Sequence, residues 1–277
     1  MSRLILFFVG IALLLGAGGA MAGPQDDMKA FQDHFKKRFP NVEHDEFANG
    51  LYAINESLRA QWEDIEDFPP YELAIDDGEE LFHKPFANGK GYADCFPKYK
   101  EGIKQNYPYF DTKQGQVVTL ELAINQCREA NGEKPLKYKK GAITSIGAYL
   151  AFLSRGKITN VVIPDDPRAL AAYEKGKQFY YTKRGQLNFS CANCHVDSPG
   201  MWVRADQLSP ALGQSTNWPV YRLKWGGMGT IHRRYGGCNG QVRAKGMKAQ
   251  GEEYRNLEYF HTFMSNGMPL NGPSSRR

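Results

Sequence analysis

The segment Cys191-Ala-Asn-Cys194-His195 constrains the fold of this chain more than any other part of its sequence. Two cysteines three positions apart on the first turn of a helix can form thioether links to both vinyl groups of one haem, and the adjacent histidine then points its imidazole at the iron. A structural zinc site is the alternative, because Cys238 and a histidine such as His232 or His261 could complete four ligands. The helical pattern before the motif and the N-terminal export signal favour haem. We therefore predict one covalently bound haem c, with His195 as an axial ligand of the iron.

The N-terminus predicts export. Arg3 precedes an apolar run over residues 4–15, and small residues end at Ala20-Met21-Ala22, so residues 1–22 are typical of a signal peptide. The apolar run is too short and too glycine-rich for a convincing membrane span, although an uncleaved anchor is the alternative. We expect a periplasmic protein without a membrane span after signal cleavage. The formal net charge is +5 with the lysines spread along the chain, so we expect no nucleic-acid partner.

The chain contains a repeated register that indicates two related halves. A Gly-x-x-x-aromatic pattern precedes Cys95 in one half and Cys191 in the other, as Gly78-Glu-Glu-Leu-Phe and Gly176-Lys-Gln-Phe-Tyr. Further on, a proline, a threonine and a cysteine follow one another at intervals of 11 and 8 positions in both halves, as Pro108, Thr119 and Cys127 and as Pro219, Thr230 and Cys238. Internal duplication is the simplest account.

These repeats predict a mainly α fold of tandem cytochrome c-like domains, the first lacking haem. Apolar residues at helical spacing end the halves, over residues 143–153 and 257–264. The domain boundaries that we expect are 23–163 for a haemless domain with an N-terminal extension and 164–277 for the haem-binding domain. Asp166 is a good N-cap with Pro167 at the first helical position, so a helix should begin there and continue to residue 181.

Other segments are predicted less directly. Residues 116–120 could begin either a strand or a helix, and the glycine-rich segment 226–240 is expected to be an irregular loop. Residues 25–75 are expected to form a helical extension that wraps the first domain, and residues 271–277 to be frayed.

The cysteine count singles out Cys238. In the first half the position of the haem motif has Cys95-Phe96-Pro97-Lys98-Tyr99, without the second cysteine and the histidine. In an oxidising compartment Cys95 and Cys127 can pair as a disulfide, which leaves Cys238 alone. Such a bridge closes a loop of about 33 residues and stabilises the fold by several kcal/mol in the chain-entropy model.

The second axial ligand has to come from downstream of His195. Methionine is usual in electron-transfer cytochromes, and the candidates are Met201, Met228, Met247, Met264 and Met268. Cys238 competes with them, because the matched register places it facing the haem if the two halves share a fold. A cysteine sulfur on iron donates electron density and lowers the reduction potential, which suits a reacting sulfur better than an electron relay.

Basic residues surround Cys238. Arg234 precedes it and Arg243 follows it. Arginines near a cysteine lower the pKa of its thiol, and their guanidinium groups can hold a dianion through paired hydrogen bonds. Gly236 and Gly237 would let the backbone come close to a ligand. The alternative is a solvated basic loop whose glycines only serve a turn.

With these residues in view, the sequence resembles the SoxA family, the larger subunits of the SoxAX cytochromes of bacterial sulfur oxidation, in the one-haem form. The resemblance covers most of the chain and rests on Arg234-Tyr-Gly-Gly-Cys238-Asn239 with Gln241-Val-Arg243-Ala, the C-A-N-C-H motif, Asn256-Leu-Glu-Tyr-Phe260 with Met264-Ser-Asn-Gly267, and Lys84-Pro85, Asn88-Gly-Lys90 and Cys95 of the first half.

The resemblance implies an enzyme, an L-cysteine S-thiosulfotransferase. SoxA-like proteins pair with a small cytochrome, SoxX, and join thiosulfate oxidatively to a cysteine of the carrier SoxYZ while two electrons pass to haem. Carried to this sequence, His195 and Cys238 would be the axial ligands, and Cys238 would also be the catalytic sulfur, often a persulfide in the family. Arg234 would bind thiosulfate with help from Arg243.

The chain departs from family members with two haems, because its first half lacks the C-x-x-C-H motif at Cys95. That half is therefore expected to serve structure or partner docking. The alternative function is a non-catalytic periplasmic electron-transfer cytochrome. A thiol or gas sensor ranks last, since the sequence supplies no recognisable output domain.

Overall fold

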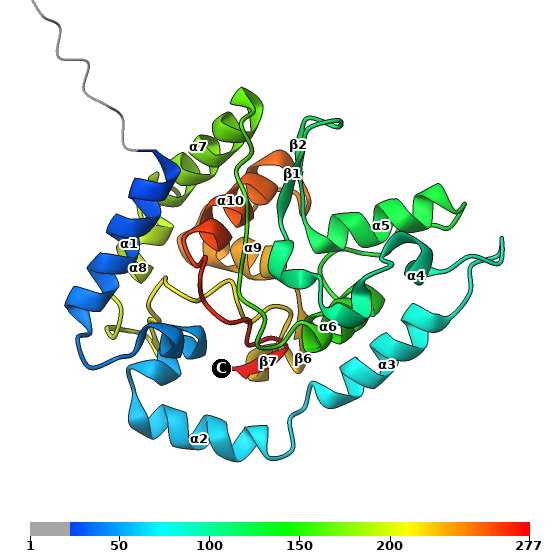
Figure 1. Cartoon of the computed structure of the whole chain (residues 1–277). Helices are drawn as coiled ribbons and strands as arrows, with labels where there is room; N and C mark the ends of the chain where they lie inside the picture. Colours follow the sequence, from blue (N-terminus) through cyan, green and yellow to red (C-terminus); the bar gives the residue numbers. More distant parts are fainter. Residues whose placement is uncertain (1–22) are drawn as a thin grey trace, which may run out of the picture.

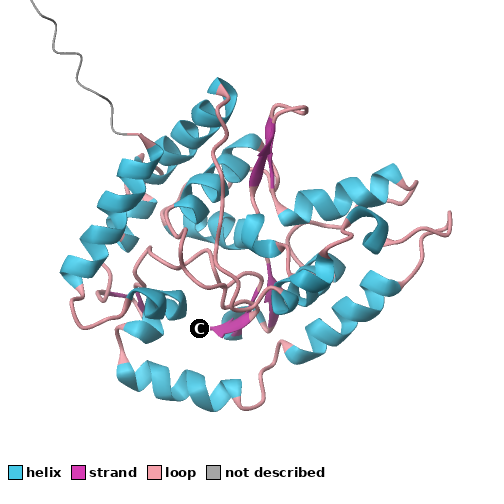
Figure 2. Ribbon diagram, in the orientation of Figure 1, coloured by secondary structure: helices cyan, strands magenta, loops and turns pink. Residues whose placement is uncertain are grey.

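The computed structural model describes residues 23–277, which form helices joined by long loops and a few short strands (Figures 1 and 2). The predicted signal peptide, residues 1–22, lies outside the described residues. Within residues 23–277, no helix is both long enough and apolar enough to cross a membrane. In chain order the elements are α1 (Pro24–Arg38), η1 (His44–Ala53), α2 (Glu56–Glu66), α3 (Glu72–His83), α4 (Tyr92–Cys95), η2 (Tyr99–Glu101), η3 (Lys104–Asn106), β1 (Tyr109–Asp111), β2 (Gln116–Val118), α5 (Leu120–Ala130), α6 (Ala142–Leu153), α7 (Pro167–Tyr181), α8 (Cys191–His195), β3 (Trp202–Val203), β4 (Asp206–Gln207), β5 (Val220–Arg222), η4 (Leu223–Trp225), β6 (Gly227–Gly229), α9 (Ile231–Gln241), α10 (Glu252–Phe263) and β7 (Ser274–Arg276).

Two crossed helix pairs organise the molecule. Helix α3 packs across α6, and α7 packs across α10. Each crossing needs a glycine, because a Cβ on Gly78 would lie 2.0 Å from the backbone oxygen of Ser145, and one on Gly176 would lie 2.0 Å from that of Asn256. The two pairs therefore repeat one packing arrangement, which confirms the predicted duplication.

The segments between the helix pairs repeat as well. In the hairpin β1–β2 Tyr109 pairs with Val118, and in β5–β6 Val220 pairs with Gly229 at the same offset. Each hairpin leads into a helix whose N-cap is a threonine: the Thr119 side chain accepts a hydrogen bond from the backbone N–H of Leu122, and Thr230 caps α9 in the same way.

Each hairpin packs on the opposite half. Val117 of β2 belongs to the hydrophobic core around α7 and α10, while Tyr221 of β5 and Met228 of β6 pack against the core around α3 and α6. The capping threonines also reach across, since Oγ1 of Thr119 donates to Oε1 of Gln250 at 2.8 Å and Oγ1 of Thr230 donates to the backbone oxygen of Tyr138 at 2.9 Å. The two halves are thus interlocked.

Several helix predictions are confirmed. Helix α7 begins after its N-cap, Asp166, with Pro167 at the first position, and ends at Tyr181. Helices α6 and α10 lie over the two periodic segments. The ambiguous segment 116–120 forms strand β2 and then the first turn of α5.

The prediction of an irregular loop over residues 226–240 is wrong. The segment contains β6 and most of α9, in which Gly236, Gly237 and Gly240 take helical positions. Each glycine costs a helix about 1 kcal/mol relative to alanine. The Thr230 cap and the packing of Tyr235 on the core outweigh that cost.

Residues 25–75 are largely helical, as predicted, but the expectation that they wrap the first half is wrong, and so is the expectation of a frayed C-terminus. Phe31 and Phe35 of α1 insert into the core of the second half, not the first, and Gln32 donates to the backbone oxygen of Asn266 at 3.0 Å. Residues 274–276 are not frayed but form β7, which pairs in parallel with β5. Both segments are ordered by partners distant in the sequence, which local patterns do not reveal.

Candidate functional site

Helix α8 presents the C-A-N-C-H motif. Ser190 caps it by accepting a hydrogen bond from the backbone N–H of Asn193 at 3.1 Å, and the Asn193 side chain reaches back to the backbone N–H of Ser190. Cys191 and Cys194 therefore lie on one turn, and His195 follows at its end. Ala192 is buried against the core and holds this turn beside α7.

The ring of His195 is oriented by the loop that follows it. Nδ1 lies 2.9 Å from the backbone oxygen of Ser209, and the side-chain amide of Gln214 lies 2.8 Å from the same nitrogen. Both contacts engage Nδ1, which leaves Nε2 as the nitrogen available to a metal. Such support of the remote nitrogen is typical of histidines that bind metals.

Cys238, on α9, is a close neighbour of this histidine. Burial raises the pKa of the Cys238 thiol, but the positive charge of Arg234 and the contact with His195 outweigh burial and lower it to about 7. By contrast, burial and then the neighbouring Cys238 raise the pKa of Cys191 to about 12. Cys238 is thus the sulfur of this site with the most thiolate character.

Two guanidinium groups lie near Cys238. Arg234 is one helical turn before it on α9, which places both on the same face. Within residues 23–277 the Arg234 side chain makes no ion pair and no hydrogen bond. Arg222 of β5 is buried and stacks on Trp225 at 5.2 Å. Burial, and then the charge of Arg234, lower the pKa of Arg222 to about 10, so an anion between these two groups would relieve their repulsion.

The remaining candidates from the sequence are Arg243 and the methionines. Arg243 is exposed at the end of α9 and contacts Oε1 of Gln186 at 3.5 Å, so its role in anion binding stays a prediction. Met201 is 62% exposed, while Met264 and Met268 are buried in the core of the second half.

The zinc alternative has no support in the described residues. Nδ1 of His232 accepts the backbone N–H of Gln250 at 3.0 Å, and its Nε2 lies 2.9 Å from Glu258. Within residues 23–277, no three histidine, cysteine or acidic side chains gather as metal ligands. The arrangement fits a haem c instead. Cys191 and Cys194 lie on one turn, and Cys238 lies near the oriented imidazole of His195.

Comparisons with known proteins agree with this geometry. The chain is 59% identical over 273 residues to the L-cysteine S-thiosulfotransferase subunit SoxA of Allochromatium vinosum, covering 98% of this chain and 96% of the relative. It is 53% identical to the subunit of the same name from Chlorobaculum tepidum, covering 91% of this chain and 87% of the relative.

The chain belongs to the SoxA family. The family model "SoxA/TsdA, cytochrome c domain" matches residues 77–158. Among solved structures, the crystal structure of SoxXA from P. pantotrophus superposes with a TM-score of 0.72 at 33% identity, covering 79% of this chain and 84% of that chain. The mainly α, cytochrome c-like fold predicted from the sequence is thereby confirmed.

The family match falls on the half of the chain that lacks the C-x-x-C-H motif. There Cys95 of α4 forms a disulfide with Cys127 of α5, as predicted, across a sequence separation of 32. The ring of Phe82 stacks on that of Tyr92 with their centroids 5.6 Å apart, and its centroid lies 4.5 Å from that of the Tyr99 ring. Aromatic rings therefore fill this core.

Sequence reasoning missed several residues around His195 and Cys238. Ser209 and Gln214 lie in an irregular loop, and Arg222 lies in a three-residue strand, so none of them carries a local signal.

Proposed function

We propose that this chain is the haem-bearing subunit of an L-cysteine S-thiosulfotransferase, which conjugates thiosulfate to a cysteine of a SoxYZ-like carrier protein. One observation carries the proposal: Cys238 lies near the oriented imidazole of His195, with Arg234 on the same helical face. The names of the similar SoxA subunits support the same activity.

Residues of this chain would hold one haem c. Cys191 and Cys194 would form the thioether links, and His195 and Cys238 would be the protein's ligands to the iron. The haem supplies a one-electron acceptor beside the sulfur. Arg234 and Arg222 would bind the sulfonate oxygens of thiosulfate, with a further contribution from Arg243, and so direct the outer sulfur of the substrate toward Cys238.

The proposed reaction has two steps. The Cys238 thiolate and the outer sulfur of thiosulfate form an S–S bond, which gives Cys238–S–S–SO₃⁻ and releases two electrons. The carrier thiolate then attacks the sulfur that bears the sulfonate, forms carrier–S–S–SO₃⁻ and returns Cys238 as a thiolate. Two one-electron acceptors are needed, so a second haem on a partner completes the reaction.

A SoxX-like small cytochrome is the partner that we propose for the second electron, since the similar solved structure is titled SoxXA. We place the complex in the periplasm, with residues 1–22 removed as a signal peptide. The half over residues 23–163 would carry no haem and would serve structure or docking, while residues 164–277 would carry the reacting site.

Replacing Cys238 with alanine tests this function. In the haem-loaded protein with its partner and carrier, Cys238→Ala should abolish formation of the carrier conjugate, measured by mass spectrometry, and should change the ligand bands of the haem spectrum. Haem content should persist, because Cys191 and Cys194 remain. The matched control is Gly240→Ala on the same helix, whose added Cβ meets nothing within 4 Å and which should retain conjugate formation.

Full conjugate formation by Cys238→Ala with its haem retained would contradict the proposal. The non-catalytic electron-transfer cytochrome would then be the better account of this chain.

A further inference from the structure

The last turn of α9, which carries Cys238, is fastened to α10 by one tyrosine. Nδ2 of Asn239, the residue after Cys238, donates a hydrogen bond to Oη of Tyr254 at 2.6 Å. The backbone N–H of Met247 donates to the same oxygen at 3.1 Å. The Tyr254 hydroxyl therefore accepts two hydrogen bonds, one from α9 and one from the loop that follows it.

That loop folds back over the last turn of α9. The backbone oxygen of Asn239 accepts a hydrogen bond from the backbone N–H of Ala244 at 2.8 Å. A Cβ on Gly246 would lie 3.4 Å from Cα of Gly236 and 3.5 Å from Oη of Tyr254. Two glycines thus let the loop lie against the helix, within reach of the Tyr254 hydroxyl.

The ring of Tyr254 packs on the same face of α9. Its centroid lies 5.5 Å from that of the His232 ring and 5.6 Å from that of the Tyr235 ring. Positions 232, 235 and 239 are separated by three and four residues, which places them on one face of a helix. Asn239 is therefore the last residue of a stripe that contacts Tyr254, and Cys238 is its immediate neighbour.

The first turn of α9 has anchors of its own. Nδ1 of His232 accepts the backbone N–H of Gln250 at 3.0 Å, and its Nε2 lies 2.9 Å from Oε2 of Glu258. Arg234 follows two residues later, one turn before Cys238. Loosening the last turn of the helix should therefore disturb Cys238 more than Arg234.

The first half holds its matching cysteine in another way. The repeated caps align Cys127 of α5 with Cys238, and Cys127 is fixed to Cys95 by the disulfide. The helix crossings align Tyr254 with Ile143, an apolar residue that is equally buried. Within residues 23–277 Cys238 forms no disulfide, so its turn of helix needs a different anchor.

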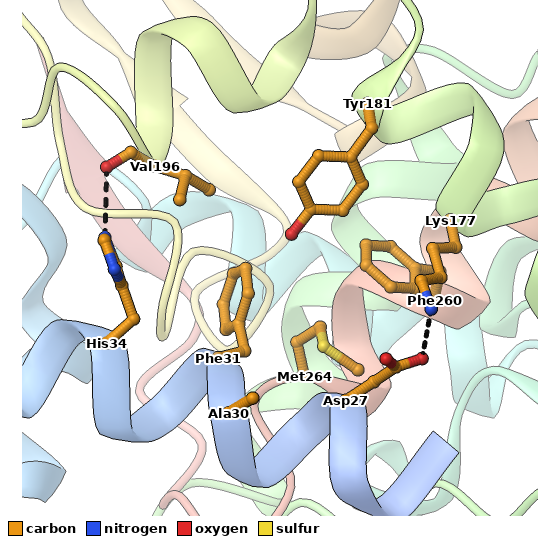
Figure 3. Close-up of a pocket in the computed structure, with 9 residues that line it drawn as sticks. All are labelled: Asp27, Ala30, Phe31, His34, Lys177, Tyr181, Val196, Phe260 and Met264. Carbon is orange, nitrogen blue, oxygen red and sulfur yellow. Dashed lines mark hydrogen bonds and ion pairs between the residues drawn. The ribbon is translucent and has the colours of Figure 1, made fainter. Parts of the chain in front are cut away.

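Helix α10 makes its other contacts elsewhere. Phe260 of α10 and Met264 just after it line a cavity of about 260 Å³ beside α1, together with Phe31 (Figure 3). Oη of Tyr259 donates to the backbone oxygen of Val162 at 2.7 Å. The contact with α9 can therefore be altered without touching these parts of α10.

We propose that Tyr254 is a positioning residue for Cys238: its hydroxyl fixes the last turn of α9, so that the Cys238 sulfur keeps its place near His195 without a covalent bond. The proposal rests on the proposed role of Cys238 as ligand and reacting sulfur. A small misplacement of a reacting group lowers a rate strongly, even when the residue responsible is distant from the chemistry. Tyr254 acts through Asn239 and needs no contact with the reactants.

The variant Tyr254→Phe tests the proposal, because it removes only the hydroxyl and keeps the buried ring. In the haem-loaded full chain with its partner and carrier, the maximal rate of conjugate formation should fall about tenfold. The thiosulfate concentration for half-maximal rate should stay within about twofold, because the anchors next to Arg234 remain. The ligand bands of the haem spectrum should shift, which is a readout independent of activity.

Tyr259→Phe is the matched control. Tyr259 lies on the same helix, is equally buried and also loses a hydrogen bond, but its partner belongs to the segment before α7 and not to α9. This variant should lower the midpoint of thermal unfolding to a similar extent and leave the rate and the haem bands unchanged. The proposal would be overturned by an equal fall in rate in both variants, by no fall in Tyr254→Phe, or by a fall accompanied by an equal rise in the thiosulfate requirement.

Asn239→Ala removes the other partner of the same hydrogen bond. Alanine favours a helix, so this variant should fold and should reproduce the slower rate. In a Tyr254→Phe background it should have little further effect, since the two residues act through one contact. Fully additive losses would refute the proposal.

The two proposals fail separately. Unaltered conjugate formation in Cys238→Ala would contradict the proposed function. An inactive Cys238→Ala together with a normal rate and normal haem bands in Tyr254→Phe would contradict only the positioning role.

Discussion

At the scale of single residues, the chemistry of the site depends on which side chains reach Cys238. Arg234 lies one helical turn before it, so the sequence alone places the two together once α9 is known to be a helix. Arg222 joins them from a strand 16 positions before Cys238, which no local pattern indicates. The two arginines near the Cys238 sulfur therefore come from two separate elements, α9 and β5.

Arg234→Lys should weaken the binding of thiosulfate. Lysine keeps the charge but cannot form the paired hydrogen bonds of a guanidinium. We therefore expect the binding free energy of thiosulfate to weaken by about 1.5–3 kcal/mol. The thiosulfate concentration for half-maximal rate should rise about 10- to 150-fold, with the haem spectrum unchanged.

Arg233→Lys is the control for this measurement. Arg233 is the adjacent residue, but it stacks on Trp225 at 4.2 Å and donates to the backbone oxygen of Met228. A thiosulfate dependence altered equally by both substitutions would speak against a binding role for Arg234.

At the scale of elements, the crossing of α7 and α10 sets the position of the haem motif. Helix α7 runs directly into the segment that carries α8, and α10 supplies Phe260 and His261 to the core beside it. Gly176 allows the close contact, because its missing Cβ would coincide with backbone atoms of Asn256. The helices cannot approach this closely with any larger residue.

Gly176→Ala should destabilise the protein strongly. The added Cβ would lie 2.0 Å from the backbone oxygen of Asn256, and a backbone atom in a helix cannot yield without separating the two helices. We expect a loss of at least about 3 kcal/mol, measured as a lower midpoint of thermal unfolding. Gly240→Ala in α9 is the control, since a Cβ there meets nothing within 4 Å and should leave stability equal or slightly higher. Equal midpoints for both variants would contradict this account of the crossing.

At the scale of the whole molecule, charged groups are buried where the halves interlock. Glu121 belongs to the first half, and it lies near Glu258 and His232 of the second. Burial, and then the charge of Glu258, raise the pKa of the Glu121 carboxyl, while Lys104 and His232 act in the opposite direction. The contact between the two halves thus buries the Glu121 carboxyl, and burial favours its neutral form.

This interface predicts a pH dependence of stability. Because the folded-state pKa of Glu121 is above the unfolded value of roughly 4.3, its contribution is fully present below that pH and is lost as the pH rises toward the folded pKa. The unfolding midpoint of the unmodified protein should therefore fall relative to that of Glu121→Gln as the pH rises above about 4.3. Glu129→Gln, an exposed glutamate of the same helix, should follow the unmodified protein at every pH. A constant difference between Glu121→Gln and the unmodified protein would refute this assignment.

The sequence by itself determined the haem motif, the duplicated register, the Cys95–Cys127 disulfide and the helices α6, α7 and α10. These features depend on spacing within one turn, on caps next to the helix that they begin, or on intervals repeated along the chain. The resemblance to the SoxA family rested on the same short segments, and full-length similarity confirmed it.

Only the tertiary structure decided the rest. It made a helix of the glycine-rich segment around Cys238, exchanged the two hairpins between the halves, placed α1 on the second half and paired the last strand with β5. It also brought Arg222 near Cys238. Each of these outcomes depends on contacts between residues far apart in the chain, whose free energy outweighs the local preference of the segment and leaves no pattern in it.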